Sequence, residues 1–142
     1  MEKKNQIWDQ AAEHYQEALQ LQTHLATRSP KQSKLIVDIS ITQYNFGNLY
    51  QVQSDLEPAL ALYHDAHNTL YRLPEGHDKL ESVQRHVINC HWAIAETSHA
   101  LKRFVDALKH WDQAIELAKE EKFLQFLKTE RQKTVSSLPM QR

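Results

Sequence analysis

Apolar residues recur at helical spacing along almost the whole chain, and their pattern repeats with a 48-residue period. The same shift relates four sets of positions: Trp8, Leu56 and Phe104; Ala11, Ala59 and Ala107; Tyr15, Tyr63 and Trp111; and Ala18, Ala66 and Ala114. Within each unit, successive members of the four sets are three or four residues apart, which places their side chains on one stripe of an α-helix. Alanines that flank an aromatic ring predict close helix packing, because the small residues let a neighbouring backbone approach and the ring fills the gap.

A second long helical pattern precedes the second and third stripes. Both of these segments are apolar on more than one side, as expected of helices that lie between neighbours in a stack. Turn signals separate the elements: Ser29-Pro30, Ser54-Asp55 with Pro58 in the following first turn, and Pro74-Glu75-Gly76. We therefore predict one all-α domain over residues 1–142, built from antiparallel helix-turn-helix repeats. The expected helices are 8–27, 33–53, 55–73, 79–101, 103–120 and a terminal helix at 122–137.

Composition narrows the possible functions. Seventeen basic residues against eighteen acidic ones leave a net charge of −1, which gives no general attraction to nucleic acid or anionic membranes. The chain has no apolar run of about 18 residues and no secretory signal at its start, and its single cysteine, Cys90, suits a reducing compartment. With only two glycines, phosphate-binding loops are not expected. We expect a cytoplasmic protein with no cofactor and no membrane or nucleic-acid partner.

The segment from 40 to 73 resembles a tetratricopeptide repeat. Phe46-Gly47 stands at the leucine-glycine pair of the first repeat helix and Tyr50 at its tyrosine, while the second helix has the alanine, aromatic and alanine at Ala59, Tyr63 and Ala66. From 88 to 121 the second helix matches at Ala107, Trp111 and Ala114. The first helix of that unit departs from the pattern, with Ala95 in place of the glycine and Ser98 in place of the tyrosine.

The period is longer than the roughly 34 residues typical of this family. The stretches AAEHYQEALQLQTHLATRSP and YNFGNLYQVQSDLEPALALYHDAHNTL are similar to long-period arrays attached to some bacterial serine/threonine kinases, notably those of planctomycetes. No kinase motif is present in this chain. Two interpretations of its ends stay open: an excerpt from a longer array, or a small complete protein whose last helix is a cap.

The resemblance implies a protein or peptide partner, held on the surface formed by the first helices of the repeats. Carried over position by position, the partner-binding residues are Ile41, Tyr44, Asn45, Asn48, Asn89, Trp92 and Glu96, with Val52, Ala93 and Ala100 at the remaining positions. Asparagine amides can pair with an extended peptide backbone, and the two aromatic rings offer rigid contact area. The alternative is that the asparagines are ordinary solvated residues and that Trp92 packs under the lengthened segment between the helices.

Three other functions have weaker signals in the sequence. His86 with Cys90, and His64 with His67, each offer two possible zinc ligands from one helix face, but the set of four that zinc needs is not evident. No catalytic motif is present, so no catalytic residue and no enzyme activity are expected. Self-assembly into a homo-oligomer, through helices at the ends of the stack, is the alternative to binding a different protein.

Overall fold

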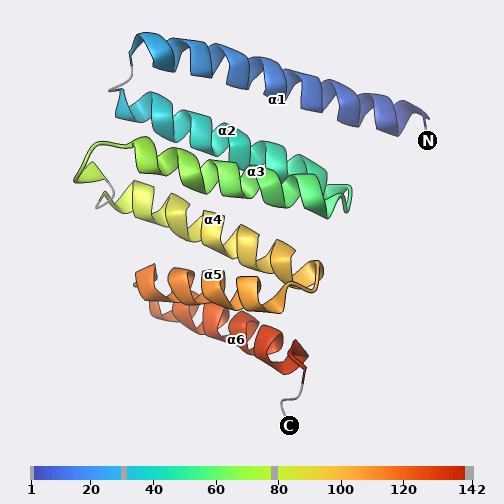
Figure 1. Cartoon of the computed structure of the whole chain (residues 1–142), viewed down its shortest axis with the longest axis vertical. Coiled ribbons are helices and arrows are strands. Elements are labelled where there is room, and N and C mark those ends of the chain that lie inside the picture. The colour runs from blue at the N-terminus through green and yellow to red at the C-terminus, as the bar shows by residue number, and fades with distance from the viewer. Residues whose placement is uncertain (1, 30–31, 78–79, 140–142) are drawn as a thin grey trace.

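A computed structural model describes residues 2–29, 32–77 and 80–139 of the chain, with side chains from residue 6 onward. These residues form six α-helices and one 3₁₀ turn, without a strand. The elements, shown in Figure 1, are α1 (Glu2–Arg28), α2 (Ser33–Val52), α3 (Leu56–Thr69), η1 (Leu70–Arg72), α4 (Glu81–Ala100), α5 (Phe104–Leu117) and α6 (Glu121–Ser137). None of these described helices is both long and apolar enough to cross a membrane.

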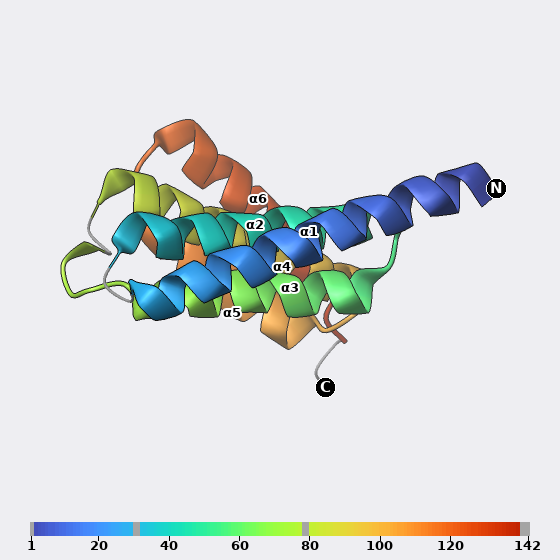
Figure 2. The same ribbon diagram turned by 90° about the horizontal axis from the view of Figure 1, so that it is seen from above.

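Consecutive helices run antiparallel and stack one on the next (Figure 1). The closest pairs are α2 with α3 and α4 with α5, and α3 packs on α4 to join the two pairs. Seen from above, α2 and α6 lie on one side of the stack and α3 and α5 on the other (Figure 2). The prediction of an all-α fold made of antiparallel helix-turn-helix repeats is confirmed.

Several predicted boundaries were wrong by a few residues. The first helix begins at Glu2 rather than at residue 8, since the residues before Trp8 are mostly good helix formers. The helix predicted to end at 73 stops at Thr69 and tightens into η1, and the one predicted to end at 120 stops at Leu117, where the backbone turns extended at Ala118. The predicted start of the fourth helix, residue 79, lies outside the described residues, and α4 is described from Glu81.

The repeated stripe forms the core of the second and third units, as predicted. Ala59, Ala66, Ala107 and Ala114 are fully buried, and the rings of Tyr63 and Trp111 are buried beside them. In the first unit Ala11, Tyr15 and Ala18 are only partly buried, because α1 packs chiefly on α2. Tyr15 stacks there on Phe46 with ring centroids 5.4 Å apart.

Gly47 shows why the second unit needs a glycine in the middle of a helix. A Cβ at this position would lie 2.8 Å from Cε1 and 2.9 Å from Cδ1 of Tyr63, and 3.3 Å from the carbonyl oxygen of Ala59. The absent side chain therefore makes room for the tyrosine ring and for the backbone of α3. One period later the corresponding residue is Ala95, which is fully buried in the core that contains Trp111.

The turns between paired helices are also equivalent. Ser54 and Lys102, which occupy the same position in successive units, both adopt the left-handed conformation, with φ of 60° and 63°. In each turn the next residue's N–H bonds to a carbonyl five residues earlier: Asp55 to Tyr50, and Arg103 to Ser98. This is the Schellman arrangement that ends many helices. Asp55 occupies the predicted N-cap position of α3, but its side chain makes no capping hydrogen bond.

Helix α6 departs from the 48-residue period. It begins at Glu121, whereas the same period counted from Glu81 at the start of α4 would place it at Thr129, because the link from α5 spans only residues 118–120. Thr134 anchors it to both preceding helices: its buried hydroxyl accepts a 3.0 Å hydrogen bond from the Trp111 indole N–H and lies 2.8 Å from Nδ1 of His99. The shorter link brings α6 against the face of α4 that carries Trp92.

Candidate functional site

A small hollow lies between α2 and α4, on the surface predicted to hold a partner. It has a volume of about 120 Å³ and is lined by Tyr44, Asn48, Gln51, Trp92, Ala93 and Glu96. Four of the seven predicted partner-binding residues, two from each helix, are therefore brought together in one place. They meet because α2 and α4 occupy equivalent positions in neighbouring repeats, so residues one period apart in the sequence become neighbours across the junction.

The other three predicted residues lie outside this hollow. Ile41 and Asn45 are exposed on α2, and Ile41 keeps 39% of its surface accessible. Asn89 is half-buried on α4, one turn before Trp92. The predicted surface thus consists of a hollow and a separate exposed stretch of α2 beside it.

A chain of hydrogen bonds links three residues that line the hollow to the buried Tyr63. The Tyr63 hydroxyl lies 2.5 Å from Oδ1 of Asn48 and 2.8 Å from Oε1 of Gln51, whose amide nitrogen donates to Oε1 of Glu96 at 3.2 Å. Both amide oxygens accept from the Tyr63 hydroxyl, whose single proton can be donated to only one of them at a time. Asn48 is therefore engaged within the protein, whereas Asn45 is exposed.

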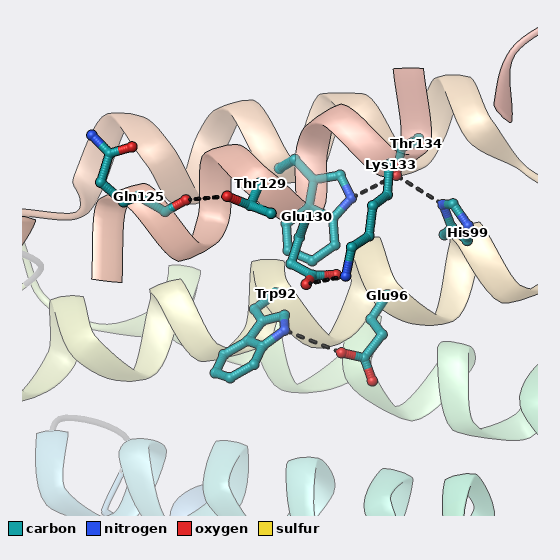
Figure 3. Close-up of polar contacts among 9 residues, drawn as sticks. Trp92, Glu96, His99, Gln125, Thr129, Glu130, Lys133 and Thr134 are labelled. Atoms are coloured by element: carbon teal, nitrogen blue, oxygen red, sulfur yellow. Dashed lines mark hydrogen bonds and ion pairs between the residues drawn. The ribbon is translucent and has the colours of Figure 1, made fainter. Parts of the chain in front are cut away.

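Trp92 has one role inside the protein and another at the surface. Its ring lies 5.8 Å from the ring of Phe123 and 5.1 Å from that of Phe126, both on α6. Its indole N–H donates to Oε2 of Glu96 at 3.2 Å, as Figure 3 shows. The packing fixes the indole, and the indole in turn holds the exposed carboxylate of Glu96 at the rim.

Two members of this site were not predicted as site residues: Gln51, and Tyr63, which was assigned to the core alone. Gln51 follows Asn48 by three residues, so the helical spacing that selected Asn48 points to it as well. Tyr63 is fully buried on α3, yet its hydroxyl bonds to Asn48 and Gln51, which line the hollow. That reach depends on the close approach of α3 at Gly47, which a sequence pattern does not measure.

The charge of the hollow comes from Glu96. Burial raises the pKa of the Tyr44 hydroxyl, with smaller contributions from Cys90 and Glu96, and burial likewise raises the pKa of Tyr63. Both hydroxyls are therefore protonated at neutral pH and supply neutral hydrogen-bonding groups. The result is a negatively charged rim beside two aromatic rings.

The histidine pairs considered as zinc ligands contact a hydroxyl group and other imidazoles. Within the described residues, no group of three or more histidine, cysteine, aspartate or glutamate side chains is arranged to hold a metal ion. The Nε2 atom of His86 instead lies 2.8 Å from the Ser40 hydroxyl, which donates to the carbonyl oxygen of Ala66. His64 and His67 face other histidines across the junction between α3, α4 and α5.

Comparison with known proteins adds no identification: no protein-family model matches this chain, and no curated protein or solved structure matches it significantly.

Proposed function

We propose that this protein binds an extended segment of a partner protein across α2 and α4, and that the hollow receives a lysine or arginine side chain of that segment. The single observation that carries the proposal is the position of Glu96, whose exposed carboxylate lies in a hollow lined by the rings of Tyr44 and Trp92. The repeat architecture and the resemblance to tetratricopeptide repeats support a role in binding rather than catalysis.

The chemistry of the hollow favours a cation over other side chains. A carboxylate attracts a cationic group, and the faces of tyrosine and tryptophan rings attract it further through cation–π interactions worth about 0.5–1 kcal/mol at exposed sites. Glu96 is preorganised by two donors, Gln51 and Trp92, so little side-chain freedom remains to be lost on binding. A volume of about 120 Å³ suits the end of one side chain rather than a whole small-molecule ligand.

The rest of the partner segment would lie along the exposed stretch of α2. Ile41 offers an apolar contact and Asn45 an amide that can pair with an extended backbone. A cytoplasmic location fits this proposal, since the lone thiol of Cys90 is free and buried.

The test uses a library of short extended peptides that differ only at one central residue: arginine, lysine, glutamine or glutamate. Calorimetry should show binding for the basic members and none for the glutamate member. Glu96→Gln should weaken binding of the basic peptides by about 1–2 kcal/mol, which is about 5–30-fold. The matched control is Glu116→Gln, which removes an exposed carboxylate from α5 on the other side of the stack and should leave affinity unchanged. Equal affinity of Glu96→Gln and the parent protein for basic peptides would refute the proposal.

Self-association is the second candidate function, favoured by an uncovered apolar stripe on α1. Ile7, Leu21 and Leu25 keep 62%, 67% and 53% of their surfaces exposed, and their spacing places them on one helix face. Sedimentation over a range of concentrations measures this directly. If the stripe is the contact, the parent protein forms dimers or larger species and Leu21→Glu shifts it to monomer, while peptide binding at Glu96 is unaffected.

A further inference from the structure

Four histidines from three helices form a cluster where the α2–α3 pair meets the α4–α5 pair. His64 and His67 come from α3, His91 from α4 and His110 from α5. Ring centroids are 4.5 Å apart for His67 and His91, 5.2 Å for His91 and His110, and 5.6 Å for His64 and His110. His91 and His110 are the deepest, with 4% and 8% of their surfaces exposed. Neither the predicted fold nor the binding hollow requires imidazoles at these positions.

The contact between the two deepest rings depends on their protonation. Nδ1 of His91 lies 2.9 Å from Nδ1 of His110, so one nitrogen must carry a proton and the other must be bare. At least one of the two imidazoles is therefore neutral whenever this hydrogen bond exists. Protonating both would place two N–H groups and two positive charges against each other in a buried site, which would break the contact.

The surroundings do not compensate for positive charge in the cluster. The titratable and charged groups that face it are Asp65 from α3, Tyr71 from η1, and Asp106 and Lys109 from α5, together with the cluster's own members on α3, α4 and α5. The two aspartates are exposed at the edge, and the lysine adds repulsion. Burial lowers the pKa of His91 to about 3 and that of His110 to about 4, and repulsion from the neighbouring histidines is the next largest cause. Burial also lowers the pKa values of His64 and His67.

We propose that the histidine cluster makes the junction between the α2–α3 pair and the α4–α5 pair sensitive to mild acid, so that the junction opens as its imidazoles take up protons. His91 and His110 are neutral in the closed junction, and an imidazole has an ordinary pKa of about 6.5 once it is exposed to water. The closed state therefore has its full stability above pH 6.5 and loses it progressively as the pH falls below that value. Because α2 and α4 belong to different pairs, opening would also separate the two sides of the hollow; that consequence alone rests on the proposed function.

The magnitude follows from the two deepest histidines. Between pH 6.5 and pH 5 an exposed imidazole becomes almost fully protonated, whereas His91 and His110 in the folded protein stay almost fully neutral. Because the unfolded state takes up these protons and the folded state does not, each histidine should raise the unfolding equilibrium constant about 15-fold across this interval. The pair should therefore raise the unfolding equilibrium constant about 200-fold. His64 and His67 add to this in the same direction.

The experiment compares urea unfolding at pH 6.5 and pH 5, in the presence of a metal chelator, for three proteins. These are the parent protein, the double variant His91→Gln with His110→Gln, and the control double variant His14→Gln with His24→Gln, which removes two exposed histidines from α1. Glutamine retains a donor and an acceptor, so the contact between α4 and α5 can be kept. The rise in the unfolding constant at pH 5 should be about 200-fold larger for the parent protein and the control than for the cluster variant. An equal rise in all three would overturn the proposal.

A second measurement needs no variant. In nitrogen-15 spectra of the parent protein, the imidazole resonances of His91 and His110 should keep the pattern of a neutral ring at pH 5.5 in every molecule that retains the contacts between α3 and α4. Doubly protonated rings in molecules that retain those contacts would show that the cluster accepts charge without opening, and would overturn the proposal. Neither measurement involves a peptide, so failure here is distinct from failure of the binding hollow.

Discussion

Gly47→Ala gives the sharpest test of the packing between α2 and α3. Alanine is favoured over glycine inside a helix by about 1 kcal/mol, so helix propensity alone predicts stabilisation. The structure predicts the opposite, because the new Cβ would lie 2.8 Å from a Tyr63 ring carbon, well inside the roughly 3.5–4.0 Å of a favourable carbon contact. The ring cannot move away freely, since it is fully buried and its hydroxyl is hydrogen-bonded to two amides of α2.

The expected cost combines three terms. Overpacking a well-filled core costs about 1–3 kcal/mol, and straining the hydroxyl contacts adds about 0.5–1.5 kcal/mol. The higher helix propensity of alanine stabilises the variant by about 1 kcal/mol. Gly47→Ala should therefore lower the free energy of unfolding by about 0.5–3.5 kcal/mol, measured by urea denaturation followed by circular dichroism at neutral pH.

Two further variants isolate the cause. Tyr63→Leu removes the ring, so adding Gly47→Ala to that variant should be neutral or stabilising by up to about 1 kcal/mol. Ala95→Gly is the reverse change at the equivalent site, and it should destabilise by about 1.5–2.5 kcal/mol through a lost buried methyl group and the helix cost of glycine. A Gly47→Ala protein that is more stable than the parent while the Tyr63 ring is present would show that α2 and α3 do not approach as closely as the Gly47–Tyr63 contact requires.

Three other outcomes are expected. Lys102→Gly should raise the free energy of unfolding by about 0.5–1 kcal/mol, because glycine relieves the left-handed backbone at φ 63°, whereas Lys102→Ala should give no gain; equal denaturation midpoints for both would contradict this. Tyr63→Phe should destabilise by about 1–3 kcal/mol in the same assay through loss of the hydroxyl contacts, and a neutral change would place the hydroxyl elsewhere. Cys90 is fully buried and burial raises its pKa to about 12, so a thiol reagent at pH 8 should label it only as fast as the protein opens; rapid labelling without urea would contradict its burial.

Periodicity along the chain was enough to predict the helices, their pairing and the stripes of the second and third units. A buried helix face repeats every few residues, so Ala59, Tyr63 and Ala66 reveal their burial by their spacing, and the 48-residue period reveals that the units are alike. The same register placed Tyr44 and Trp92 at equivalent positions, and both line the hollow.

Only the tertiary structure decided how side chains from different helices converge. The length of each link and the rotation of each helix about its axis set those contacts. The spacing of apolar residues within one helix predicts neither quantity. A link of three residues, 118–120, brings α6 onto Trp92 and ends the 48-residue period. The packing of α3 on α4 and α5 collects four histidines that are scattered from residue 64 to residue 110. Those contacts join distant parts of the sequence, and their energies depend on burial that exists only once the helices have packed.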